Sequence, residues 1–111
     1  MYRIENLEKL SVMAKLAPDT MHMFQAFDAA ALAAGAIPRK YKELIALGIA
    51  LTTQCPYCLE IHHDAAQKAG ANATELAEVV FVAAALRAGG AVTHGTHLMQ
   101  SQIAGVASAA R

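Results

Sequence analysis

Residues 53–63 are the stretch around which the rest of the chain is organised: Thr53-Gln54-Cys55-Pro56-Tyr57-Cys58-Leu59-Glu60-Ile61-His62-His63. The stretch holds both cysteines of the chain. Pro56 suits the first position of a helix, where its missing N–H leaves no hydrogen bond unmade. We therefore predict a helix that ends near Thr53, a reversal near Gln54, and a second helix from Pro56 that carries both cysteines at its start.

The whole sequence has the composition of a helical protein. Alanine supplies 26 of its 111 residues, and alanine, leucine, glutamate, lysine and methionine are strong helix formers. No alternating apolar and polar run predicts a strand. We expect one all-α domain over residues 1–111, a bundle of about six helices at residues 5–16, 20–34, 39–53, 56–69, 73–88 and 91–107.

Local signals predict several of these helix ends. Asp19 is a good N-cap for the second helix. Asn72 and Glu75 have the spacing of a capping box before the fifth helix, and Gly89-Gly90 is expected to break the chain after it. Residues 44–51 are apolar on every side, which predicts a central helix that is buried all round.

Composition and charge narrow the possible partners. The net charge is zero and no basic run occurs, so we expect no nucleic acid partner. The apolar runs Leu44–Leu51 and Val79–Leu86 are eight residues each, whereas a membrane span needs about 20. We therefore expect no membrane span.

Two further expectations concern location and assembly. The N-terminal residues lack the pattern of a secretory signal, which together with a close cysteine pair predicts a cytoplasmic protein. Hydrophobic residues make up 56% of the chain, more than so short a chain can bury by itself. The surplus predicts a homo-oligomer.

The cysteines and His62 form a pattern suited to thiol chemistry. Only a thiolate is a strong nucleophile, and a helix N-terminus favours the thiolate. Cys58 and His62 are four residues apart, so they lie on one face of the helix. His62 can then accept the Cys58 proton, whereas His63 is rotated by about 100° and is a poorer partner.

Glu43 is the only carboxylate of the preceding helix. A carboxylate beside a buried segment needs a partner. If the chain reverses near Gln54, a rise of about 1.5 Å per residue brings Glu43 level with His62 to within a turn. We predict a relay in which Glu43 orients His62 and His62 activates Cys58.

This site can reduce a small peroxide. Cys58 is expected to take an oxygen and become a sulfenic acid. Cys55, nearer the helix end and more exposed, then condenses with it to a disulfide, and an external dithiol restores the pair. The predicted catalytic residues are Glu43, Cys55, Cys58 and His62, and no cofactor or metal is assigned.

The residues Glu43, Cys55, Cys58 and His62 have the spacing E-x11-C-x2-C-x3-H. This resembles the core signature of the AhpD-like alkylhydroperoxidases, within the carboxymuconolactone decarboxylase family, and the resemblance covers residues 38–98. It implies an all-helical fold, assembly as trimers or hexamers, and peroxidase activity with a glutamate–histidine proton relay. It also implies a dithiol reductant, a dihydrolipoyl-carrying or thioredoxin-like protein. The best-known peroxidase has a histidine between its cysteines, where this chain has Pro56 and Tyr57.

Alternatives remain open at this stage. The cysteines could be buried structural thiols, or could bind zinc with His62 and either His63 or Glu43. Glu43 could instead be a surface carboxylate paired with a neighbouring cation, Arg39 or Lys40.

The function also has alternatives. The same cysteine pair could serve a non-catalytic redox sensor that forms a disulfide without turnover. A decarboxylase or other lactone-acting enzyme on the same fold is a third class, although the decarboxylases of the family lack the cysteine pair.

Overall fold

The computed structural model describes residues 1–102, which form helices joined by short loops and contain no strand. The prediction of an all-α protein is confirmed. The elements are η1 (Ile4–Lys9), α1 (Leu10–Leu16), α2 (Pro18–Leu32), α3 (Arg39–Thr53), α4 (Pro56–Lys68), α5 (Ala73–His94) and η2 (Gly95–Met99), where η is a 3-10 helix.

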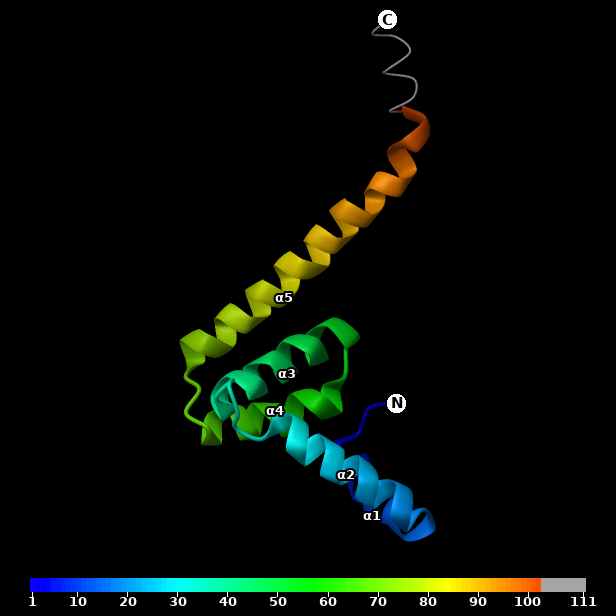
Figure 1. Cartoon of the computed structure of the whole chain (residues 1–111), viewed down its shortest axis with the longest axis vertical. Coiled ribbons are helices and arrows are strands. Elements are labelled where there is room, and N and C mark those ends of the chain that lie inside the picture. Colours follow the sequence, from blue (N-terminus) through cyan, green and yellow to red (C-terminus); the bar gives the residue numbers. More distant parts are fainter. Residues whose placement is uncertain (103–111) are drawn as a thin grey trace, which may run out of the picture.

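A hairpin of α3 and α4 lies at the centre of the molecule (Figure 1). The first part of α5 packs on α3, and the remainder extends away from the hairpin. The pair formed by α1 and α2 projects from the opposite side and contacts the centre through α2 and α3. α3 is therefore the helix that contacts the most neighbouring helices, as its apolar sequence predicts.

The reversal between α3 and α4 is built on Gln54. This residue has left-handed backbone angles (φ 56°, ψ 49°) and caps α3, and the N–H of Cys55 donates to the carbonyl of Ala50 at 3.0 Å. Left-handed geometry is uncommon for a residue with a side chain, but it returns the chain within one residue. The turn predicted near Gln54 is confirmed, and it places the cysteines beside α3.

The buried stripe of α3 consists of Glu43, Leu47 and Ala50, all at most 5% exposed. The rest of the helix differs from the prediction that it is buried all round. Ile45 and Ile49 are 51% and 57% exposed, because α4 and α5 cover only part of its circumference. The prediction of complete burial is wrong for a single chain.

Helix starts match the sequence signals in one case and not in another. Asn72 and Glu75 form the predicted capping box before α5, with the Asn72 side chain accepting from the Glu75 N–H at 2.8 Å. Asp19 is not an N-cap: α2 begins at Pro18, and Ala17 occupies the cap position without a side-chain hydrogen bond. Proline at the first helical position starts the helix two residues earlier than predicted.

Gly89-Gly90 does not break the chain. α5 runs continuously through both glycines to His94, and helical structure continues through η2. Each interior glycine lowers the stability of a helix by about 1 kcal/mol relative to alanine. This loss is too small to end a helix whose backbone hydrogen bonds continue on both sides of the glycines. The separate helix predicted at residues 91–107 is therefore a continuation of α5, and its residues 103–107 lie outside the described part.

The continuous helical segment Ala73–Gln102 has 30 residues and is long and apolar enough, by length and composition alone, to cross a membrane. Only 6% of its most apolar window is buried within the chain. Counting uninterrupted apolar residues missed this segment because Arg87 ends the run. Such a helix needs a covering surface, which either a second copy or a lipid bilayer offers.

The single chain leaves much of its apolar surface uncovered. Its radius of gyration is 20.3 Å, whereas a compact chain of this length has about 13 Å. Phe81, Leu86 and Val92 on α5 are each more than two-thirds exposed. α5 is too long and too apolar to be held by the rest of one chain.

Candidate functional site

The two cysteines lie in the first turn of α4. Cys55 is the N-cap residue, and its sulfur accepts a hydrogen bond from the N–H of Cys58 at 3.3 Å. Both cysteines are free thiols and both are partly buried. Because the first N–H groups of a helix have no backbone acceptor, the Cys55 sulfur takes the place of an N-capping oxygen.

The pKa values of the two thiols are shifted in opposite directions. Hydrogen bonding from the Cys58 side chain, followed by the N–H groups of Cys58 and Tyr57, lowers the pKa of Cys55 below its ordinary value of 9.0. The same hydrogen bond, burial and the charge on Cys55 raise the pKa of Cys58 to about 11. The sequence predicted the opposite order, with Cys58 as the readier thiolate.

Glu43 and His62 are in direct contact. The Nδ1 of His62 lies 2.6 Å from Oε2 of Glu43, and the Glu43 side chain is 1% exposed. A carboxylate only accepts hydrogen bonds, so Nδ1 carries the proton and Nε2 is left as the basic nitrogen. The predicted juxtaposition of Glu43 and His62 is present.

The second oxygen of Glu43 is held by Arg39. The Arg39 Nε donates to Oε1 at 2.9 Å from one turn earlier on α3. Both carboxylate oxygens thus have a charged or chargeable donor, which offsets the cost of burying the negative charge. The alternative of a surface carboxylate is wrong, although the pairing with Arg39 that it included is correct.

His62 follows Cys58 by one turn on the face of α4 that packs against α3. The imidazole is 17% exposed. Within residues 1–102 no hydrogen bond joins it to either sulfur. The site therefore consists of a thiol pair at the helix start and a carboxylate-held imidazole one turn further along.

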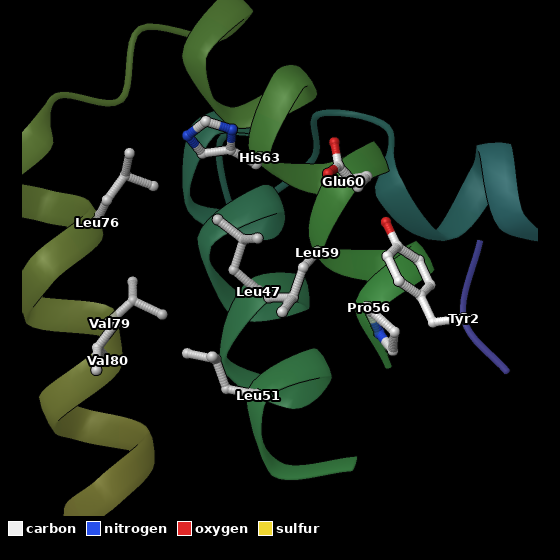
Figure 2. Close-up of a pocket in the computed structure, with 10 residues that line it drawn as sticks. All are labelled: Tyr2, Leu47, Leu51, Pro56, Leu59, Glu60, His63, Leu76, Val79 and Val80. Carbon is white, nitrogen blue, oxygen red and sulfur yellow. The ribbon is translucent and has the colours of Figure 1, made fainter. Parts of the chain in front are cut away.

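His63 belongs to the other face of α4. With Pro56, Leu59 and Glu60 it lines a largely apolar groove of about 410 Å³ between α3, α4 and α5 (Figure 2). Neither sulfur, Glu43 nor His62 is among the lining residues. The groove is thus separate from the thiol pair.

The described part of the chain contains no group of three His, Cys, Asp or Glu side chains arranged to hold a metal ion. The zinc alternative required three or four such groups to converge on one point. Glu43 and His62 are instead in contact with each other.

Sequence reasoning missed the surroundings of Tyr57. Its hydroxyl accepts hydrogen bonds from the Asn6 side chain at 2.8 Å and from the N–H of Arg3 at 3.3 Å. These partners are more than 50 residues away in the sequence, and no spacing or local pattern links them. Tyr57, between the two cysteines, thereby joins the thiol turn to the start of the chain.

Two curated relatives have sequences similar to this one. One is "Uncharacterized protein 4 in cox locus" of Paracoccus denitrificans, 41% identical over 71 residues, which are 64% of each chain. The other is an uncharacterized protein of Haemophilus influenzae, 37% identical over 54 residues, which are 49% of this chain and 48% of that protein. The chain thus spans less than two-thirds of the length of either relative.

A solved structure has a similar fold. The crystal structure of a carboxymuconolactone decarboxylase family protein from Legionella pneumophila, in its apo form, superposes with a TM-score of 0.67. The two chains are 35% identical, and the match covers 69% of each. The likeness extends over most of the described helices.

The family model matches a continuous stretch that contains the whole site. The model of the carboxymuconolactone decarboxylase family matches residues 18–101, from the start of α2 to beyond η2. Glu43, both cysteines and His62 all fall inside this range. The chain belongs to the carboxymuconolactone decarboxylase family.

Proposed function

We propose that this protein is a thiol peroxidase of the alkylhydroperoxidase type, in which Cys55 and Cys58 reduce a hydroperoxide. The family includes both decarboxylases and alkylhydroperoxidases, so membership alone does not select the reaction. The observation that carries the proposal is the buried Glu43 carboxylate bound to His62 one turn beyond Cys58. An oriented base beside a thiol pair suits proton transfer in thiol chemistry.

The first step is transfer of the Cys58 proton. The acceptor that we assign to this proton is Nε2 of His62, one turn further along α4. Glu43 keeps the opposite nitrogen protonated and stabilises the imidazolium that forms. Because its pKa is about 11, Cys58 is protonated at neutral pH and needs a base. The relay supplies that base.

The redox steps then balance. The Cys58 thiolate attacks one peroxide oxygen, the O–O bond breaks, and the alkoxide takes the proton from His62 and leaves as an alcohol. Cys55 attacks the sulfur of the Cys58 sulfenic acid, and the displaced hydroxide leaves as water with the Cys55 proton. The peroxide is reduced by two electrons, and the two thiols become one disulfide.

An external dithiol restores the pair by thiol–disulfide exchange. We propose a dihydrolipoyl-carrying or thioredoxin-like protein in the cytoplasm for this role. Cys55 is the sulfur at the helix end, where a partner thiolate can attack it and displace Cys58 as a thiolate. The second thiol of the partner then attacks the partner's own sulfur in the mixed disulfide and displaces Cys55, which leaves readily because its pKa is lowered.

We also propose that copies of this chain associate, as trimers or hexamers. Support comes from the exposed apolar faces of α3 and α5 and from the extended shape of one chain. A second copy of the chain can cover these faces, and no other component is needed. Binding to lipid vesicles in a flotation assay would instead favour a bilayer as the covering surface.

A steady-state assay tests the proposed reaction. We expect the protein to consume tert-butyl hydroperoxide over many turnovers with dihydrolipoamide as donor, and Cys58→Ser to abolish turnover. One oxidation per chain without turnover would favour a redox sensor. Turnover of a lactone that survives replacement of both cysteines by serine would favour the decarboxylase class.

A further inference from the structure

The segment of residues 2–6 lies against the first turn of α4, and we name it the N-terminal strap. Its most direct contact is the 2.8 Å hydrogen bond from Asn6 Nδ2 to the Tyr57 hydroxyl, and the N–H of Arg3 donates to the same oxygen at 3.3 Å. One hydroxyl between the two cysteines therefore receives two donors from a distant part of the chain.

An aromatic contact adds to these hydrogen bonds. The ring of Tyr2 packs edge to face on the ring of Tyr57, with centroids 4.8 Å apart and planes at 60°. Figure 2 shows Tyr2 beside Pro56 and Glu60, so the strap also lies along the outer surface of the helix start. Aromatic pairs of this geometry contribute about 0.5–1.5 kcal/mol beyond the area they bury.

The residue that the strap holds belongs to the thiol turn itself. The Cys55 sulfur accepts the N–H of Cys58 at 3.3 Å, and Tyr57 is the residue directly before that N–H. Formation of a disulfide requires the two sulfurs to reach about 2.05 Å with a Cβ–S–S–Cβ dihedral near 90°. The contacts of Tyr57 with the strap are those of the pair as free thiols, before this change of geometry.

We propose that Tyr57 is a positioning residue, through which the N-terminal strap stabilises the dithiol form of the Cys55–Cys58 pair relative to the disulfide. This rests on the proposed function only in requiring the pair to cycle between the two forms. The strap then influences the driving force for re-reduction by the external dithiol, although it touches neither sulfur.

The test is the equilibrium between the cysteine pair and glutathione, measured without peroxide. Tyr57→Phe removes the shared acceptor and keeps the ring, and Asn6→Ala removes the closer donor. Each is expected to shift the equilibrium roughly threefold to tenfold toward the disulfide, the range of one hydrogen bond. The double variant is expected to shift it no further than Tyr57→Phe, because both changes remove the same contact.

Tyr41→Phe is the matched control, since Tyr41 is 48% exposed and lies away from the thiol turn. Wild-type equilibrium constants in Tyr57→Phe and Asn6→Ala would overturn the proposal, as would fully additive shifts. If Tyr57→Phe does not fold, Asn6→Ala alone decides in the same way. Absent peroxidase activity would overturn the proposed function but would leave this equilibrium, and its result, intact.

Discussion

At the residue scale, the two cysteine side chains shift each other's pKa in opposite directions. Cys55→Ala removes the largest cause of the raised pKa of Cys58, which is about 11 in the intact pair. We expect that pKa to fall toward the ordinary range, so alkylation of Cys58 in this variant becomes faster at neutral pH. Iodoacetamide rates over a pH series measure it.

The reciprocal variant gives the opposite shift. Cys58→Ala removes the side-chain donor that lowers the pKa of Cys55, so alkylation of Cys55 is expected to need a higher pH than in the intact pair. Identical pH profiles for a given cysteine in the intact pair and in the single-cysteine variant would contradict this mutual shift of the two pKa values.

Glu43 offers a prediction on stability. Glu43→Gln places an amide NH₂ against one of two donors, Arg39 Nε or His62 Nδ1, which approach the carboxylate from opposite oxygens. Either the NH₂ faces the Arg39 N–H, or His62 moves its proton to Nε2 to accept it, and in both cases charge-assisted hydrogen bonds in a buried position are lost. We expect the free energy of unfolding to fall by about 1–3 kcal/mol. Urea denaturation measures the loss, and Glu60→Gln on the exposed side of α4 is the control.

The contact between Glu43 and His62 could be predicted because helix geometry and one turn determine it. Helical rise places two residues on neighbouring antiparallel helices once the reversal at Gln54 is located. The order of the two thiol pKa values could not be predicted, because it depends on the burial and hydrogen bonding of two side chains within one helical turn. The contact of Tyr57 with Asn6 joins segments that no local pattern connects.

At the scale of the element, the two glycines inside α5, Gly89 and Gly90, are expected to lower the stability of that helix. A Cβ added at Gly89 or Gly90 meets no atom within 4 Å, so alanine fits there without repacking. Each of Gly89→Ala and Gly90→Ala is expected to raise the free energy of unfolding by about 0.5–1 kcal/mol. Thermal denaturation followed by circular dichroism measures the gain.

Gly70 provides the matched comparison. Its site is equally open, but its φ is +99°, a backbone conformation that alanine adopts only with strain. Gly70→Ala is therefore expected to destabilise the protein. Destabilisation by Gly89→Ala as well would show that α5 needs a break at that point.

The strength of each local signal explains which helix ends the sequence predicted correctly. The capping box at Asn72 and Glu75 combines two reciprocal hydrogen bonds, and such a signal is local and complete. Gly89-Gly90 and Asp19 are weaker signals, because glycine only lowers helix propensity and a cap residue competes with a neighbouring proline. Helix ends with a specific hydrogen bond could be predicted, and those that rest on propensity alone could not.

At the scale of the whole molecule, exposed apolar side chains predict association. Ile49 on α3 is 57% exposed and lines a groove of about 550 Å³ between α3 and α5. We expect the protein to sediment as an oligomer at micromolar concentration. Ile49→Glu is expected to shift it to smaller species, because a buried unpaired charge in an interface is strongly unfavourable.

Lys15→Glu on α1 is the control for Ile49→Glu, since it changes charge at a position outside that groove. Analytical ultracentrifugation distinguishes the variants. A wild-type chain that sediments at the mass of one copy, 11.7 kDa, would show that its apolar faces are not covered by another copy.

The most direct measurement of the central claim compares His62→Ala with His63→Ala in steady-state hydroperoxide reduction with dihydrolipoamide. The two histidines are adjacent in the sequence, but His62 is held by Glu43 and His63 lines the separate groove. We expect His62→Ala to lower kcat/KM for the peroxide about 10²–10⁴-fold, the range of a general base, and His63→Ala to leave it close to that of wild type. Equal activity in the two variants would contradict the relay.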